Sequence, residues 1–181
     1  MPQEFVVVAP RQIEFREYEE PALQSHEVRI KSLVSGIKHG TELALYRGTA
    51  PFFASRFDAE SRLFLPAESG AMYPCNLGSW LVGEVSEVGG EVTRFQVSDF
   101  VYGKMPHRPS HVRLEDEVYP LGLAMNPETA VFTDPAIFAL QAVHDAQIKV
   151  GDRVAIFGMG ALGLLAVQMA RLSGKALFIY E

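Results

Sequence analysis

Cysteine is nearly absent from this sequence, since Cys75 is the only one among 181 residues. A single thiol excludes an intramolecular disulfide, and without a cysteine cluster the chain cannot form a structural zinc site of that type. No run approaches the roughly 18 consecutive apolar residues of a membrane helix, so we expect no membrane partner. The apolar run Val6–Ala9 is too short for the core of a secretory signal. The sequence therefore predicts a cytoplasmic protein.

Clusters of basic residues are also missing. The 16 Lys and Arg residues are scattered along the chain and the net charge is −6, whereas proteins that bind nucleic acid carry a basic patch. We therefore expect no nucleic-acid partner. The remaining composition, 48% hydrophobic and 21% charged, is that of an ordinary globular protein and argues against disorder, collagen and coiled coils.

The first two thirds of the chain have the pattern of β-structure. Short apolar or alternating runs, separated by Pro, Gly and Asp, predict a series of short strands typical of a barrel or a sandwich. These runs cover residues 4–9, 13–17, 27–35, 80–89, 100–103, 111–114 and 118–121. A short helix is expected within Gly36–Gly48. Residues 51–72 show no clear period, which predicts a long irregular excursion.

The pattern changes near Pro127. Residues 127–147 carry apolar side chains at helical spacing, and Arg153–Phe157 has the composition of a buried strand. A glycine-rich turn, a helix over Leu164–Ser173 and a second buried strand over Ala176–Tyr180 follow. Together these elements predict one βαβ unit, with parallel strands joined by a right-handed crossover.

The glycine-rich turn has the pattern G-x-G-x-x-G between a predicted strand and a predicted helix, the context in which this motif binds dinucleotides. Gly158 would allow the tight turn, Gly160 would leave room for the pyrophosphate, and Gly163 would let helix and strand pack closely. The helix N-terminus would offer free N–H groups to the phosphates. The predicted cofactor site comprises Gly158, Met159, Gly160, Ala161, Leu162 and Gly163. A glycine turn that binds nothing is the alternative.

An acidic residue, Glu181, lies 18 positions beyond Gly163, at the end of the next predicted strand. Its carboxylate is placed to accept hydrogen bonds from the ribose hydroxyls and to repel a 2′-phosphate. The sequence therefore favours NAD as the cofactor, with NADP possible. A merely solvated carboxylate is the alternative interpretation.

The order of segments resembles the medium-chain dehydrogenase/reductase superfamily over essentially the whole chain. The resemblance is carried by VRIKSLVSGIKHGTE, LGSWLVGEVSEVGGEVTRFQVSDFVYG and DPAIFALQAVHDAQIKVGDRVAIFGMGALG. It implies a mixed fold, with a GroES-like β-barrel domain over residues 1–125 and a linking helical segment over 126–151. Residues 152–181 would be the first, incomplete βαβ unit of a Rossmann-type NAD(P)-binding domain. Residues 36–49 show some likeness to the bacteriochlorophyllide dehydrogenase subgroup.

The catalytic zinc ligands of the family do not carry over to this chain. Where zinc-dependent members have a ligand cysteine, this sequence has Lys38 or His39, depending on the alignment. The second ligand belongs to a Gly-His-Glu triplet, which is Gly78-Ser79-Trp80 here. Asp134 matches a third ligand position, and the lobe with four structural cysteines is missing. The resemblance therefore implies a zinc-free member with no metal site, since a catalytic zinc usually has three protein ligands.

The same positions supply the catalytic candidates. By resemblance, Lys38 and His39 stand where the family keeps its catalytic ligand, and Thr41 stands where it keeps a proton-relay hydroxyl. His39 is the better acid–base candidate because an imidazole titrates near neutrality. Solvated loop residues are the alternative. Ser79 and Trp80 would face the substrate pocket, although a core tryptophan is an equal alternative for Trp80.

Three further ionisable side chains receive structural interpretations. Glu42 lies in the first turn of the predicted helix, where a carboxylate stabilises the helix end. His107 and His111 are expected to be structural or exposed, because no third metal ligand lies at a suitable spacing.

The resemblance implies an NAD(P)-dependent oxidoreductase that transfers hydride between nicotinamide and an alcohol or carbonyl group of a small-molecule substrate, without catalytic zinc. Two alternatives remain open: an enone or quinone reductase, and a catalytically degenerate nucleotide-binding regulatory protein.

The length of the second domain suggests an incomplete fold. A doubly wound fold needs two βαβαβ halves, so we expect this chain to be the N-terminal part of a polypeptide of about 300–350 residues. Such a fragment is expected to bind dinucleotide poorly and to be inactive alone. Family members usually pair through the missing C-terminal region, which predicts a homo-oligomer.

Overall fold

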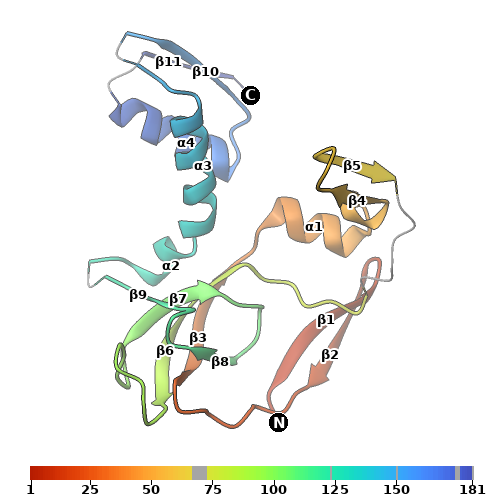
Figure 1. Ribbon diagram of the computed structural model, residues 1–181, viewed down its shortest axis with the longest axis vertical. Coiled ribbons are helices and arrows are strands. Elements are labelled where there is room, and N and C mark those ends of the chain that lie inside the picture. Colours follow the sequence, from red (N-terminus) through yellow and green to blue (C-terminus); the bar gives the residue numbers. More distant parts are fainter. Residues whose placement is uncertain (67–72, 123, 150, 174–175, 181) are drawn as a thin grey trace. The chain divides into compact units, whose positions relative to one another are not determined.

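The computed structural model describes residues 1–66, 73–122, 124–149, 151–173 and 176–180. They divide into two compact units, Met1–Val131 and the residues from Phe132 onward. The elements of both units are labelled in Figure 1. The first unit is built mainly from antiparallel strands, whereas the second contains a parallel strand pair. The chain is therefore a mixed α/β protein, and each unit is described by itself.

A five-stranded antiparallel sheet forms the centre of the first unit (Figure 1). Its spatial order is β8 (Ser110–Leu114), β3 (Glu27–Gly36), β6 (Trp80–Val88), β7 (Phe100–Lys104) and β9 (Tyr119–Pro120). The sequence predicts strands at each of these places, because their valine-rich runs fit a pleated, half-buried surface. The long strand β3 pairs with β6 along most of its length and with β8 in its first half.

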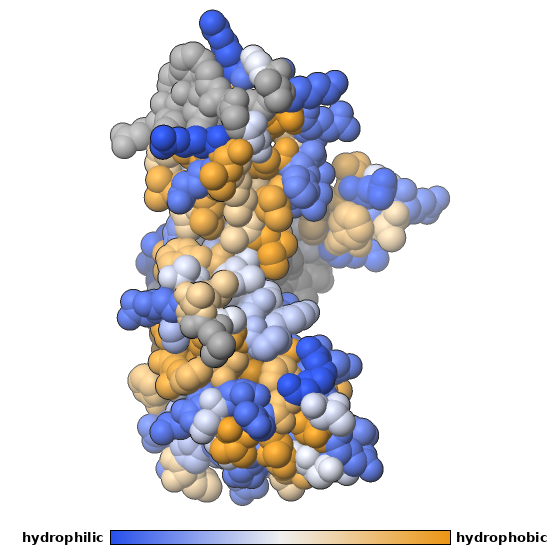
Figure 2. Space-filling view, turned by 90° about the vertical axis from the view of Figure 1, so that its left-hand side faces the viewer, coloured by the Kyte–Doolittle hydropathy of each residue, from blue (hydrophilic) through white to orange (hydrophobic). Residues whose placement is uncertain are grey.

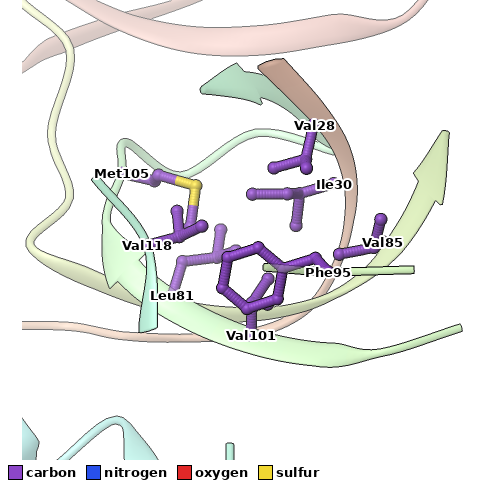
Figure 3. Packing of buried hydrophobic residues seen from close by; sticks show 8 residues of the cluster. All are labelled: Val28, Ile30, Leu81, Val85, Phe95, Val101, Met105 and Val118. Carbon is purple, nitrogen blue, oxygen red and sulfur yellow. The ribbon is translucent and has the colours of Figure 1, made fainter. Parts of the chain in front are cut away.

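The apolar core lies against this sheet. Its side chains are at most 7% exposed and come from β3, β6, β7 and the loops beside them. Figure 3 shows how they converge: Val28, Ile30, Leu81, Val85, Phe95, Val101, Met105 and Val118. Burial of these apolar groups is the main stabilising term for the first unit.

A separate hairpin joins β1 (Gln3–Ala9) to β2 (Gln12–Glu17). Val6 and Val7 of β1 are buried, whereas every residue of β2 is exposed. After β3 the chain forms α1 (His39–Arg47), which ends at Gly48 in the left-handed conformation, with φ of 72°. Glycine is favoured there because it has no Cβ to oppose a positive φ.

The segment predicted to be irregular contains regular structure, so that prediction is wrong for the described residues. A 3₁₀ turn, η1 (Pro51–Phe53), precedes the antiparallel strands β4 (Ser55–Asp58) and β5 (Leu63–Pro66). Phe57 and Phe64 face each other across the two strands, with ring centroids 5.3 Å apart. The hairpin is largely exposed on both faces, so its sequence lacks the alternation that reveals a half-buried strand.

The helical segment predicted over 127–147 is two helices. Asn126 caps α2 (Pro127–Ala130) by accepting a hydrogen bond from the Glu128 N–H, and α2 ends at the boundary of the first unit. The second helix, α3 (Thr133–Asp145), starts the second unit. Proline at the first position of α2 suits a helix start, because the missing N–H has no partner there anyway.

The predicted βαβ arrangement is present in the second unit. Strands β10 (Arg153–Phe157) and β11 (Ala176–Tyr180) pair in parallel and are connected by α4 (Ala161–Leu172). The helix begins at Ala161, three positions before the predicted start at Leu164, because the glycine-rich turn continues directly into it.

Many large apolar side chains lie at the surface of the second unit, in the upper part of Figure 2. They belong to α3, β10 and α4 and include Ile137, Phe138, Leu140, Phe157, Leu162, Leu164 and Leu172. None of the helices in the described part of the chain is long and apolar enough to span a membrane.

His111 of β8 is a buried imidazole in the first unit. Its side chain is 1% exposed, its Nδ1 accepts a hydrogen bond from Arg108 Nε at 3.3 Å, and its Nε2 has no hydrogen-bond partner among the described residues. Burial, together with the positive charges of Arg108 and Arg113, lowers the pKa of His111 from 6.5 to about 3. The folded chain therefore holds this ring neutral.

We expect this histidine to make the fold sensitive to acid. Between pH 6.5 and about 3 the unfolded chain binds a proton at His111 that the folded chain does not, so the free energy of unfolding falls as the pH falls. The slope from one such group is at most about 1.4 kcal/mol per pH unit. We expect the free energy of unfolding of His111→Gln, measured with urea across this pH range, to change less steeply with pH than that of the exposed-site control His26→Gln. Equal slopes would contradict the assignment.

Candidate active site

Three polar side chains from distant parts of the first unit form a continuous hydrogen-bonded chain. Nε2 of His107 lies 2.9 Å from Oε2 of Glu42, and Nδ1 of His107 lies 2.7 Å from Oγ of Ser35. The side chain of Glu42 is 6% exposed and that of His107 is 10% exposed. Buried polar side chains are stable in a folded protein when they are hydrogen-bonded to one another, as these are.

Backbone contacts hold this network in place. The second carboxylate oxygen of Glu42, Oε1, accepts a hydrogen bond from the backbone N–H of Lys38 at 2.9 Å. This contact confirms the predicted role of Glu42 at the start of α1, and the carboxylate also binds His107. The backbone N–H of His107 donates to the carbonyl of Leu77 at 2.8 Å.

Gly78 permits the close approach of the segment that carries His107. Its φ is 133°, and a Cβ there would lie 2.7 Å from the backbone nitrogen of His107 and equally close to the carbonyl carbon of Pro106. Real Cβ atoms do not come that close to backbone atoms. Any other residue at this position would push His107 away from Ser35 and Glu42.

The network forms part of the wall of a pocket with a volume of about 440 Å³. The wall is otherwise apolar or aromatic and comes from β1, β2, β3, α1 and the segment before β6. It consists of Phe5, Ile13, Ser35, Ile37, Glu42, Leu43, Tyr46, Leu77 and His107. The Phe5 ring stacks on the imidazole of His107, with centroids 5.6 Å apart. A mostly apolar pocket with a few convergent polar groups is the usual form of a small-molecule site.

The predicted catalytic residues lie together at the start of α1. Lys38 precedes the helix and is partly buried, whereas His39 and Thr41 are exposed on its first turn. None of the three belongs to the pocket wall. Their role in catalysis stays a prediction.

Ser79 and Trp80 lie beside that segment, because Gly36 at the end of β3 pairs with Trp80 at the start of β6. Ser79 accepts a backbone hydrogen bond from Met105 at 3.2 Å through its carbonyl oxygen. Trp80 packs beside Tyr102 and Tyr119, with ring centroids 5.5 and 6.3 Å away, and is partly buried. Their predicted place in a substrate pocket stays a prediction, and neither lines the pocket described above.

The glycine-rich turn in the second unit has the geometry that the sequence motif requires. Gly158 has φ of 92°, and Gly160 is the N-cap of α4, with no side-chain cap. No heavy atom of the described residues, apart from chain neighbours, lies within 4 Å of a Cβ built on Gly158 or Gly160. A Cβ on Gly163 would overlap the carbonyl oxygen of Gly158. The turn therefore packs tightly against the helix at Gly163, and at Gly160 it leaves space that a ligand could occupy.

The remaining residues of the motif begin α4. Met159 and Ala161 are partly buried and Leu162 is exposed. The first N–H groups of a helix have no partner within the helix, so this end can bind a phosphate. Glu181, the predicted ribose contact, lies outside the described residues. Among the described residues, no group of three or more His, Cys, Asp or Glu side chains gathers that could hold a metal ion.

The sequence alone did not indicate that His107 is part of a site. The prediction weighed His107 as a possible metal ligand, but its partners Glu42 and Ser35 are 65 and 72 positions away in the chain. No local pattern links residues that far apart. The only local hint in the sequence is Gly78, just before a predicted strand. An isolated glycine at a strand end suggests that another backbone segment comes close to it.

Comparisons with known proteins agree with the fold. No protein-family model matches the sequence. The chain is 34% identical over 187 residues to D-guloside 3-dehydrogenase of Escherichia coli K12, covering 98% of this chain and 53% of that protein. It is 25% identical over 197 residues to (R,R)-butanediol dehydrogenase of Bacillus subtilis, covering 91% of this chain and 53% of that protein. The chain thus spans about half the length of these curated relatives.

A solved structure, CAD from Helicobacter pylori complexed with NADP(H), has the same fold. Its TM-score is 0.77 at 16% identity, and the match covers 99% of this chain and 58% of that one. The similarity to dehydrogenases extends over nearly the whole chain. These relatives and structural neighbours support the medium-chain dehydrogenase/reductase superfamily, which the sequence resembles.

Proposed function

We propose that this protein is an NAD(P)-dependent oxidoreductase that transfers hydride between nicotinamide and an alcohol or carbonyl group of a small molecule. The glycine-rich turn between β10 and α4 carries this proposal. Its open side at Gly160, its close packing at Gly163 and the free N–H groups of the helix start fit a dinucleotide pyrophosphate. The bound cofactor supplies the hydride chemistry, and the chain supplies binding and orientation. GroES-like and Rossmann-type domains are the folds that we assign to the two units.

We further propose that this oxidoreductase works without catalytic zinc. Of the positions where zinc-dependent relatives have ligands, Ser79 is a poor zinc ligand and Lys38 an uncommon one. His39, which is exposed on α1, and Asp134 remain as a nitrogen and an oxygen donor, at most two of the three protein ligands. The donor set therefore does not fit a catalytic zinc, which needs three protein ligands and an open position. Metal analysis that finds stoichiometric zinc in the purified protein would overturn this part of the proposal.

Cofactor titration of the full-length protein tests the proposal directly. We expect NADH or NADPH to bind with a change in nicotinamide fluorescence, and NADH to bind more tightly if Glu181 contacts the ribose. Absence of binding to both cofactors would overturn the proposed function. Analysis of products then distinguishes the two enzyme classes, since carbonyl reduction gives an alcohol and enone reduction saturates a C=C bond.

A further inference from the structure

We propose that Ser35, His107 and Glu42 form a proton relay, and that the pocket beside them binds an alcohol with an apolar body. This inference rests on the proposed function and deepens it by assigning the group that takes the substrate proton. It differs from the sequence prediction, which placed acid–base catalysis at His39.

The hydrogen-bond network allows one direction for the relay, with Glu42 as the carboxylate and the His107 ring neutral. A carboxylate only accepts hydrogen bonds, so the proton between Glu42 and His107 belongs to Nε2 of the imidazole. In the neutral ring Nδ1 is then an acceptor, and the Ser35 hydroxyl donates its proton to it across 2.7 Å. The tautomer is inferred from the network in this way. The lone pairs of the Ser35 oxygen are left to accept a hydrogen bond from a ligand.

The pocket around Ser35 determines the kind of ligand. Phe5, Ile13, Leu43 and Leu77 supply apolar surface, and the polar side chains of the network are nearly buried. An apolar group would gain free energy by leaving water for this surface. A hydroxyl on the same molecule would complete the hydrogen bonding of Ser35. An ionic ligand would lose its hydration without gaining a counter-ion, because Glu42 already binds His107 and the Lys38 N–H.

The proton transfer balances with the hydride transfer. During oxidation the substrate O–H bond breaks and its proton moves to Ser35 Oγ, while the Ser35 proton moves to Nδ1 of His107. The nicotinamide cofactor, which the turn over Gly158–Gly163 would hold, would supply the hydride acceptor, so the carbinol hydrogen would leave with the electron pair of its C–H bond. The substrate carbon becomes a carbonyl carbon. His107 becomes an imidazolium beside the Glu42 carboxylate, and it returns the proton when the reaction runs in reverse.

Two separate measurements test the relay and the pocket. The first uses the protein without cofactor and observes the ring nitrogens of His107 by ¹⁵N NMR. We expect the Nε2–H tautomer, and we expect benzyl alcohol, but not toluene, to shift the Nδ1 resonance. Ser35→Ala should abolish that shift and weaken benzyl alcohol binding by about 2- to 10-fold, the contribution of one hydrogen bond. Ser86→Ala, in which an exposed serine of β6 is replaced, is the matched control.

The second measurement is turnover of the full-length protein. Ser35→Ala and His107→Gln should each lower kcat by about 10²- to 10⁴-fold, the usual contribution of a positioned acid–base group, with a smaller change in KM. His26→Gln, which alters an exposed histidine paired with Glu91, should retain wild-type turnover. Thermal unfolding of each variant separates misfolding from loss of the relay.

The outcomes that contradict the inference are distinct. An Nδ1–H tautomer of His107 would overturn the relay. An equal response of the Nδ1 resonance to toluene and benzyl alcohol would overturn the ligand assignment. Wild-type turnover in Ser35→Ala would overturn the relay. A full-length wild-type protein with no NAD(P)-dependent turnover would overturn the proposed function instead, and the two NMR results would still decide the pocket.

Discussion

Replacing Gly160 by valine is expected to abolish NADH and NADPH binding while the chain stays folded. Gly160 caps α4 with φ of −76°, a value that any residue adopts, and the space around its missing Cβ is open. The added side chain would occupy the place proposed for the pyrophosphate. Loss of two hydrogen bonds to a charged phosphate costs about 3 kcal/mol or more, which weakens binding at least about 100-fold. Nicotinamide fluorescence titration of the full-length protein measures this.

Two other glycine variants give this prediction its controls. Gly90→Val, at another glycine with open space in the first unit, should bind both cofactors like the wild type. Gly163→Val should lose stability as well as binding, because its Cβ would overlap the Gly158 carbonyl oxygen. Wild-type cofactor affinity in Gly160→Val would show that the turn does not hold the dinucleotide.

Ile30→Ala should lower the free energy of unfolding of the first unit by about 2–5 kcal/mol, the cost of removing a buried isoleucine side chain to Cβ. Ile30 is 0% exposed and is one of the core side chains drawn in Figure 3. Its strand is paired on both sides, so the backbone cannot readily collapse into the cavity. Urea unfolding followed by fluorescence measures this, since Trp80 is the single tryptophan and belongs to this unit.

Leu33→Ala is the matched control for the core variant. Leu33 lies on the same strand, β3, but is 48% exposed, so its truncation should change the free energy of unfolding by less than about 0.5 kcal/mol. Equal losses in the two variants would show that the core is not packed as described.

The strands of the central sheet could be predicted from sequence because one of their faces is buried. In the first part of Glu27–Gly36, buried Val28 and Ile30 alternate with charged residues, and the alternation follows the pleat. Trp80–Val88 instead begins with the buried run Leu81–Gly83, and its apolar composition predicts a strand. The hairpin β4–β5 could not be predicted, since neither of its faces is consistently buried and its stabilising contact is one aromatic pair. The periodicity of apolar residues in a sequence reflects the burial of one face. An exposed hairpin buries little surface, so its sequence shows little periodicity.

The candidate site was predictable only where its residues are adjacent in sequence. The glycine motif lies within six consecutive residues, and each glycine has the geometry expected of it. The network of Ser35, Glu42 and His107 depends on tertiary folding. Its third member reaches the other two only because Gly78 lets two backbone segments come together. A single histidine in a loop carries no pattern that would reveal such a partner.

Strand β3 has a consequence for any attempt to redesign this protein's specificity. The same strand places Ile30 in the core and Ser35 in the pocket wall, so substitutions along it would alter both folding and the pocket proposed to bind a ligand. Ile13 and Leu43 line the same pocket from β2 and α1 and are 49% and 38% exposed. Libraries that vary these two positions can change the shape of the pocket at little cost in stability, and they are the natural starting point for directed evolution.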